Sequence, residues 1–350
     1  MNINILADTI KNSNNILVIS HFNPDPDSIG STLFALNVLK KNFPEKNINA
    51  SIEGAIPETY SFLEGFNAIL KSDNISETIL ELKPELIIML DGGIFGRFSR
   101  EHSSEVGASI RDNSIKTIVF DHHNPEHQDP VDFYINERRS STCEQIYLIF
   151  RDQLNLKIDI EDKKAVLFGI IDDTGRFMYN NNYHNDTFKI ASELVSDGLN
   201  IEELQLHTHM LNKYSLMVVQ ELTNNYMQSD VCNYSFVSDE FGTKYIENGF
   251  DLGDYNIGYH FFMDNYLRNL QPFKWGYILV PDLDLGKGKY KGSFRAIYGS
   301  IDVSILAKNL NGGGHKAAAG FKLQAESIKD ALEKTTEVIK ANIEVAILNK

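Results

Sequence analysis

Residues 15–41 read NILVISHFNPDPDSIGSTLFALNVLKK. The apolar run at 15–20 has the length of a buried strand, and Leu33, Leu36 and Leu39 then supply apolar positions of a helix. A buried strand that leads directly into a helix is typical of a parallel α/β sheet. We therefore expect the polar residues between them to lie at the carboxyl edge of that sheet, where ligands bind.

The alternation of strands and helices continues to about residue 200. Further strands are predicted at 47–52, 86–90 and 117–120, and helices at 28–41, 141–153 and 162–172. The pattern at 201–228 is helical and polar, which indicates a connector. After it come strand-like runs at 234–237, 275–280 and 292–298, a glycine turn at 312–314 and a helix from 325 to about 342, with no assignment for 239–271.

These elements predict two domains with a cleft between them. The first, residues 1–200, is an α/β domain whose parallel sheet carries helices on both faces. Residues 201–228 form a helical linker, and residues 229–350 form a smaller α+β domain. A length of 350 residues fits two domains of ordinary size.

Composition restricts the setting and the substrate. Hydrophobic residues make up 42% and charged residues 23%, as in soluble globular proteins. The N-terminus resembles no signal peptide, no apolar run is long enough to span a membrane, and the two cysteines form no CxxC pair. We expect a cytoplasmic protein. Its net charge of −15 does not suit long nucleic acid, so either the substrate is small or bound cations supply positive charge.

The loop after the first strand contains His21, Asp25 and Asp27. Two prolines stiffen it and favour extended backbone, and alternation along an extended segment would point both carboxylates the same way. The alternative is a helix N-cap by Asp27 or Ser28. A cap accounts for one acid but not for the histidine and the second acid.

Three more acidic strings follow apolar elements. The string DGG at 91–93 is as consistent with an ordinary turn as with a site. The string DHH at 121–123 favours a metal site over a solvated loop, because histidine is the commonest metal ligand and a carboxylate orients its ring. The string DDTGRF at 172–177 places two acids at the C-terminus of a predicted helix, where they interact unfavourably with the helix dipole. A bound cation would compensate for this interaction. The alternative is that the string only forms a turn.

Together these strings predict a metal centre. Clustered carboxylates repel one another unless a cation lies among them. Mixed oxygen and imidazole ligands suit manganese, iron or zinc better than magnesium or calcium alone. There are enough ligands for two ions, and two-metal sites promote in-line attack of activated water on phosphorus.

The four strings HFNPDPDSIGS, DGG, DHH and DDTGRF resemble the motifs of the DHH phosphoesterase superfamily, in the same order. Residues 292–320, GSFRAIYGSIDVSILAKNLNGGGHKAAAG, resemble its DHH-associated domain. The resemblance spans about residues 14–325. It implies two Mn²⁺ ions, with Mg²⁺, Fe²⁺ or Co²⁺ as substitutes. It also implies that His21 and Asp25 hold one ion, that Asp27, His122 and Asp173 hold the other, and that Asp91 bridges both.

The same resemblance implies roles beyond the ligands. His123, with Asp91, would be catalytic and face the scissile phosphate, Asp121 would orient a histidine, and Asp172 has no counterpart in the motif. Arg97 and Arg176 would either reach a phosphate or neutralise nearby acids. In the second domain the expected substrate contacts are Arg295, Gly312, Gly313, Gly314 and His315. Without the resemblance, the glycines would indicate only a tight loop.

The resemblance is greatest to stand-alone oligoribonucleases that also act on adenosine bisphosphate. It implies hydrolysis of short RNA, dinucleotides or related nucleotides, no membrane attachment, and a homodimer as the family tendency. A cyclic-dinucleotide phosphodiesterase, a polyphosphate or pyrophosphate hydrolase, and a non-catalytic nucleotide sensor remain alternatives. The complete ligand set argues against the sensor. Base stacking on Tyr298 or Phe294 would argue against the polyphosphatase.

Overall fold

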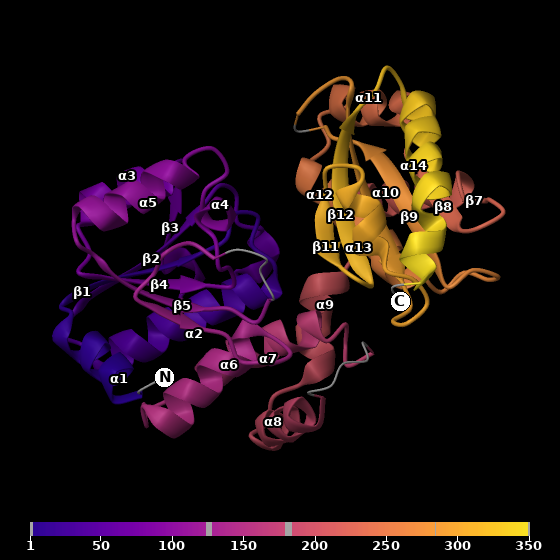
Figure 1. Cartoon of the computed structure of the whole chain (residues 1–350). Helices are drawn as coiled ribbons and strands as arrows, with labels where there is room; N and C mark the ends of the chain where they lie inside the picture. The colour runs from indigo at the N-terminus through magenta and orange to yellow at the C-terminus, as the bar shows by residue number, and fades with distance from the viewer. Residues whose placement is uncertain (1–2, 124–127, 179–183, 284, 349–350) are drawn as a thin grey trace. The chain divides into compact units, whose positions relative to one another are not determined.

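The computed structural model describes residues 3–123, 128–178, 184–283 and 285–348. The chain divides into two compact units, residues 1–208 and 209–350. The stretch 201–228 contains helix α9 (Ile201–His209), helix α10 (Lys213–Asn224) and the short strand β7 (Met227–Gln228). Each unit is built around its own sheet (Figure 1).

The sheet of the first unit is six-stranded, with the order β3-β2-β1-β4-β5-β6, and every neighbouring pair is parallel. The strands are β1 (Asn15–Ser20), β2 (Asn47–Glu53), β3 (Ile69–Ser72), β4 (Leu86–Leu90), β5 (Lys116–Phe120) and β6 (Phe133–Ile135). This confirms the predicted parallel α/β fold and the strands expected at 15–20, 47–52, 86–90 and 117–120. The two edge strands, β3 and β6, were not predicted.

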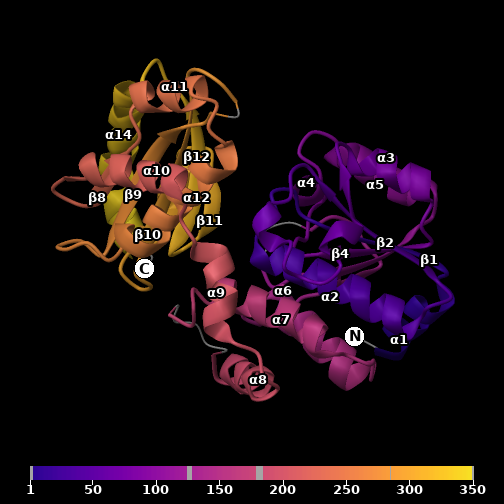
Figure 2. The same cartoon turned by 180° about the vertical axis from the view of Figure 1, so that it is seen from behind.

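Apolar side chains fill both faces of this sheet. Along β1, Ile16 and Val18 belong to one core, whereas Leu17 and Ile19 belong to the other. The first core includes α1 (Ile3–Asn12), α2 (Pro26–Asn42), α6 (Thr142–Leu148), α7 (Ile160–Asp173) and α8 (His184–Ser196); the second includes α3 (Ile75–Leu82), α4 (Phe95–Phe98) and α5 (Ser103–Asp112). Figures 1 and 2 show these groups on opposite sides of the sheet. Burial on both faces explains why the central strands are almost continuously apolar.

The order of the strands reverses direction at β1, which lies between β2 and β4. In a doubly wound sheet the crevice at such a switch point, beyond the carboxyl ends of the strands, is where ligands bind. The loops that follow β1, β4 and β5 carry three of the four acidic strings. Strand order therefore brings together residues that are up to about a hundred positions apart.

The second unit has a mixed sheet of order β11-β12-β10-β9-β8-β7, in which only the β8–β9 pair is parallel. Its other strands are β8 (Asn233–Phe236), β9 (Trp275–Pro281), β10 (Lys289–Ala296), β11 (Gly313–His315) and β12 (Ala318–Gln324). Helices α13 (Val303–Lys308) and α14 (Ile328–Leu348) share one core with the sheet, and α10 and α12 (Leu252–Phe262) share the other. The predicted α+β class is confirmed.

One expectation for the second unit needs correction, and one stretch without a prediction can now be described. Residues 312–314 were predicted to form a turn, but Gly313 begins the short strand β11, which pairs with β12. Residues 239–271, which had no assignment, are largely helical and contain α11 (Asp239–Glu247), α12 and a π-helical turn at Met263–Leu267. The helix α12 buries Tyr255, Tyr259 and Phe262 against the sheet.

Candidate metal centre

His21 follows β1 directly and is almost fully buried. Its Nδ1 lies 2.9 Å from the backbone oxygen of Phe22. A carbonyl oxygen only accepts, so Nδ1 carries a proton and donates it there. This leaves Nε2 to face the carboxylates of Asp25, at 3.5 Å, and Asp91, at 3.2 Å. Fixing one ring nitrogen by a backbone oxygen so that the other can bind a metal is a common arrangement in protein metal sites.

Helix α2 begins earlier than the sequence predicted, at Pro26. Its N-cap is Asp25, whose Oδ1 accepts a hydrogen bond of 2.9 Å from the backbone N–H of Ser28. The alternative interpretation, a cap at Asp27 or Ser28, was therefore wrong, and so was the expected extended segment, because Asp27 lies in the first turn of the helix. Proline suits that first helical position because it has no N–H to satisfy. Asp25 and Asp27 face the centre because of this helix start, not because of strand alternation.

Asp91 lies at the middle of the centre and is buried. Its φ of 60° places it in the left-handed region, while its N–H still bonds to Phe120 O at 2.9 Å. The Oδ2 atom faces His21, and the Oδ1 atom lies 3.7 Å from Nε2 of His122 and 3.4 Å from Nδ1 of His123. A strained backbone that the surrounding fold maintains is characteristic of functional positions.

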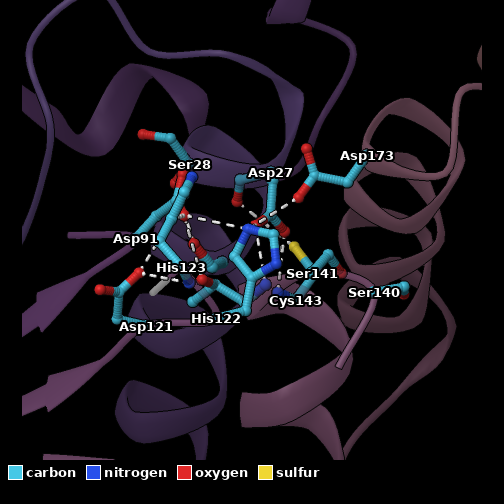
Figure 3. A network of polar contacts seen from close by, with 12 residues as sticks. Asp27, Ser28, Asp91, Asp121, His122, His123, Ser140, Ser141, Cys143 and Asp173 are labelled. Atoms are coloured by element: carbon cyan, nitrogen blue, oxygen red, sulfur yellow. Dashed lines mark hydrogen bonds and ion pairs between the residues drawn. The ribbon is translucent and has the colours of Figure 1, made fainter. Parts of the chain in front are cut away.

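Asp27, His122 and Asp173 form the other side of the centre (Figure 3). Nε2 of His122 lies 3.1 Å from Oδ2 of Asp173 and 4.0 Å from Oδ2 of Asp27. The two oxygens of Asp27 also accept hydrogen bonds from the backbone N–H groups of Thr142, at 2.7 Å, and Cys143, at 2.8 Å. The loop after β5, the end of α7 and the starts of α2 and α6 therefore meet at one point.

The electrostatics of this cluster favour a cation. Burial raises the pKa of Asp27 well above its usual value, and the charges of Asp173 and Asp91 raise it further. Burial alone would lower the pKa of His21 and of His122, but the carboxylates around each ring outweigh it and raise both values to about 10. A proton on each ring thus replaces, in the metal-free protein, positive charge that a bound cation would otherwise supply.

The donor atoms fit divalent metal ions. Around this centre, three sets of side chains each bring their ligand atoms within 4.8 Å of one another: His21, Asp25 and Asp91; Asp91, His122 and His123; and Asp27, His122 and Asp173. Asp91 and His122 each belong to two of the sets. Oδ2 of Asp173 is buried, and its ion-pair partner is Nε2 of His122 at 3.1 Å, so two potential ligand atoms face one another as they would around a common ion. Mixed carboxylate and imidazole donors suit manganese, iron or zinc.

A chain of polar contacts positions His123. Nδ1 of the ring and the backbone N–H of His123 both bond to Oδ1 of Asp121, at 2.9 and 3.1 Å. Oδ2 of Asp121 accepts a bond of 2.7 Å from the hydroxyl of Tyr134 on β6. Gly93 leaves room for these groups, because a Cβ there would lie 2.8 Å from the Tyr134 hydroxyl and 3.1 Å from Asp121. Both oxygens of Asp121 are thus engaged in orienting the histidine.

Two residues of this centre, Tyr134 and Thr142, were missed from the sequence. Tyr134 lies on a short edge strand that gives little pattern, and no acidic string flanks it. Thr142 follows two serines at the start of α6. Such a run of N-capping residue types indicates a helix start, and it was the only pattern in the sequence that could have drawn attention to Thr142. Its hydroxyl donates to Oδ1 of Asp91 at 3.2 Å.

Arg97 is the predicted substrate contact that lies beside the centre. Arg97 is half-buried on α4. It packs against Gly92, the residue after Asp91, so closely that a Cβ added to Gly92 would lie 3.2 Å from the Cβ of Arg97. Its backbone oxygen accepts a bond of 3.0 Å from the N–H of Phe22, next to His21. Arg97 is thus tied to two of the loops that carry the acidic strings.

The other predicted substrate contacts belong to the second unit. Arg295 and His315 are close in the sheet, since both pair with Ala318 of β12. Nε of Arg295 lies 3.2 Å from Asp264, in the segment that had no assignment. Gly312 packs so tightly that a Cβ would come within 2.1 Å of Gly320 O, whereas a Cβ on Gly313 would meet nothing.

The two aromatic residues considered for base stacking differ. Phe294 is fully buried in the core, because alternate residues of β10 face α13 and α14, so its suggested role in stacking was wrong. Tyr298, in the turn after β10, is 63% exposed.

Buried carboxylates and imidazoles gather at the switch point of a parallel sheet, and a mixed-sheet unit follows, as in two-domain, metal-dependent phosphoesterases. Residues 15–170 match the model of the DHH family, N-terminal domain, and residues 278–341 match the DHHA1 domain. The chain belongs to the DHH phosphoesterase family, as its motifs predicted. It is therefore a hydrolase of phosphate esters.

Relatives within this family differ in what they act on. The bifunctional oligoribonuclease and PAP phosphatase NrnA of Bacillus subtilis is 25% identical over 327 residues, which cover 91% of this chain and 92% of that protein. The cyclic-di-AMP phosphodiesterase PdeA of Listeria monocytogenes is 23% identical over 96% of this chain, but the chain spans only 49% of its length.

A solved structure supports the fold over the whole chain. An exopolyphosphatase-related protein of Bacteroides fragilis superposes with a TM-score of 0.81 at 24% identity, covering 98% of this chain and 97% of that one. In the part of the chain that the structure describes, no helix combines the length and apolar character needed to cross a membrane.

Proposed function

We propose that the protein hydrolyses short oligoribonucleotides and dinucleotides to mononucleotides, and also adenosine bisphosphate, with two manganese ions as cofactors. The observation that carries the proposal is that Asp91 and His122 are each shared between sets of metal-ligating side chains. Shared ligands place two sites side by side, which is the arrangement needed to hold two ions ~3.5–4 Å apart.

In this proposal His21 and Asp25 hold one ion and Asp91 bridges to the other. The second ion is held by Asp27, His122 and Asp173. The orientation of the His21 ring and the close approach of His122 Nε2 to the buried Oδ2 of Asp173 support these roles. Mg²⁺, Fe²⁺ or Co²⁺ would substitute, because the donors discriminate only modestly among such ions.

The chemistry follows from this arrangement. Divalent ions lower the pKa of a bound water and neutralise charge on the phosphoryl oxygens. His123 donates its Nδ1 proton to Asp121, so its Nε2 is the ring atom left to face the scissile phosphate and stabilise developing charge. Arg97 contacts a substrate phosphate, for which a guanidinium is well suited.

A short substrate fits the charge of the protein. A net charge of −15 disfavours binding along a nucleic-acid backbone, whereas one or two phosphates need only the metal centre and a few cations. Arg295, Gly312, Gly313, Gly314 and His315 are the proposed substrate contacts of the second unit. Similarity to the Bacillus subtilis enzyme over nearly its full length supports this substrate class. We further propose a cytoplasmic location and a homodimer.

The second candidate function is hydrolysis of cyclic dinucleotides. The similarity to the Listeria monocytogenes phosphodiesterase over 96% of the chain favours it.

One assay separates the candidates. With Mn²⁺ supplied, kcat/KM is measured on dinucleotides, 20-nucleotide RNA, adenosine bisphosphate, cyclic dinucleotides and pyrophosphate. We expect dinucleotides to be the preferred substrate, with kcat/KM at least about tenfold above 20-nucleotide RNA. A preference for cyclic dinucleotides or for pyrophosphate would contradict the proposal.

A further inference from the structure

Thr142 contacts two of the carboxylates at the centre. Its backbone N–H donates to Oδ2 of Asp27 at 2.7 Å, and its hydroxyl donates to Oδ1 of Asp91 at 3.2 Å. The side chain is fully buried. Both acceptors are proposed metal ligands, but Thr142 belongs to none of the metal-ligating sets and follows none of the acidic strings.

We propose that Thr142 is a positioning residue that fixes the rotation of the Asp91 carboxylate, so that one oxygen serves each metal ion. The inference rests on the proposed two-metal function. The terminal torsion of an aspartate is broad and roughly two-fold, so the backbone of Asp91 alone does not determine the plane of its carboxylate. Three neighbours act on it: Oδ2 lies 3.2 Å from Nε2 of His21, Oδ1 lies 3.4 Å from Nδ1 of His123, and Oδ1 accepts a hydrogen bond of 3.2 Å from the hydroxyl of Thr142. Of these three, only Thr142 contributes a hydroxyl donor that is not itself a candidate metal ligand.

The backbone segment that carries Thr142 is confined on both sides. Ser141 caps α6 by accepting a 3.0 Å bond from the N–H of Glu144, which fixes the first turn of the helix. Cys143, the next residue, is wedged between α2 and α7: a Cβ on Gly30 would lie 3.0 Å from its sulfur, and one on Gly169 only 2.4 Å. Figure 3 shows Ser141 and Cys143 near Asp27. A donor on so confined a segment can orient a carboxylate before any ion binds.

The matched substitution is Thr142→Val, which keeps the shape and both backbone N–H bonds to Asp27 but removes the hydroxyl. Thr142→Ser restores the donor. A suitable control is Thr335→Val, because Thr335 is also fully buried but its hydroxyl bonds to Ala331 O within α14 of the second unit. Each purified variant is first compared by thermal unfolding without metal, so that losses of stability are known.

The test is Mn²⁺ binding measured by electron paramagnetic resonance of free Mn²⁺ and by calorimetry. Loss of an orienting partner beyond the ligands typically costs ~10–100-fold in metal affinity. We expect the Mn²⁺ concentration that half-saturates the two-ion state to rise at least about tenfold in Thr142→Val. It should stay within about threefold of the unsubstituted protein in Thr142→Ser and in Thr335→Val.

Two results would overturn the positioning role: Thr142→Val binding Mn²⁺ as well as the unsubstituted protein, or Thr142→Ser losing as much affinity as Thr142→Val. Either result would be compatible with the proposed two-metal function. If the unsubstituted protein bound no Mn²⁺, the proposed function would fail together with the inference. The unsubstituted protein therefore separates the two failures within the same experiment.

Discussion

At the scale of single residues, the metal centre depends on side chains whose directions are fixed before any ion binds. His21 is oriented by the oxygen of Phe22, His123 by Asp121, and Asp27 by two backbone N–H groups. That the candidate ligand residues cluster could be predicted, because they occur in short acidic strings directly after strands or helices. Tyr134 and Thr142 could not, because their role depends only on where an edge strand and a helix N-terminus meet the strings in space.

Asp91→Ala removes the carboxylate shared between sets of ligands. We expect kcat/KM to fall by at least about a thousandfold, or ~4 kcal/mol of transition-state stabilisation. The fold should be retained, since Asp91 belongs to a polar loop and not to either apolar core, and circular dichroism checks this. Activity near that of the unsubstituted protein would exclude the bridging role.

Tyr134→Phe removes the hydroxyl that bonds to Asp121 and leaves every proposed ligand in place. We expect kcat to fall roughly three- to tenfold, about 1 kcal/mol for one lost hydrogen bond, with Mn²⁺ affinity unchanged. The matched control is Tyr290→Phe, because Tyr290 also bonds to an aspartate at 2.7 Å, but in the second unit. Equal losses in both variants would argue against a role for Asp121 in orienting His123.

At the scale of elements, the close packing of α2 and α7 determines where the acids of the first and last strings lie. Gly30 on α2 and Gly169 on α7 allow this approach, since a Cβ on Gly30 would come within 2.5 Å of Ala165 O. The central strands were predictable from their apolar runs. The edge strands β3 and β6 were not, because they are short and partly exposed: in β3 only the first and last residues are buried.

Gly169→Ala introduces a methyl group into this packing. The new Cβ would lie 2.4 Å from the sulfur of Cys143 and 2.8 Å from Oδ1 of Asp27. We expect a loss of ~1–3 kcal/mol in the free energy of unfolding, together with weaker Mn²⁺ binding. Adding Cys143→Ala should restore part of the stability, because it removes one of the two clashes.

The control for that variant is Gly96→Ala, because a Cβ on this helical glycine of α4 meets nothing within 4 Å. It should leave stability unchanged or raise it by up to about 1 kcal/mol. Chemical denaturation and Mn²⁺ titration of the three variants measure both effects. If Gly169→Ala behaved like Gly96→Ala, the account of how α2 and α7 position Asp27 would be wrong.

At the scale of the whole molecule, each unit has its own apolar cores, and the metal-ligating sets found among the described residues lie in the first. The order of the elements predicted an α/β fold followed by an α+β fold, and the two sheets agree with those classes. The helices at 239–271 were beyond prediction, because their aromatic residues are interleaved with glycine, asparagine and aspartate, which are poor helix formers. The preferred substrate also could not be predicted, because relatives with similar sequences act on different nucleotides.

Mn²⁺ should stabilise the first unit selectively. At a concentration of one hundred times Kd, a ligand that binds only the folded state contributes ~2.7 kcal/mol for each site. The single tryptophan, Trp275, lies on β9 and reports the unfolding of the second unit. We expect Mn²⁺ to raise the midpoint of a calorimetric transition and to shift the Trp275 fluorescence midpoint less. Equal shifts in both signals, or no shift in either, would contradict a metal centre confined to the first unit.

The most direct test of the metal centre is anomalous diffraction from crystals grown with Mn²⁺. The account predicts two anomalous peaks ~3.5–4 Å apart. One should lie among His21, Asp25 and Asp91, and the other among Asp27, Asp91, His122 and Asp173. Absence of any peak there at saturating Mn²⁺, or peaks bound to other side chains, would contradict it.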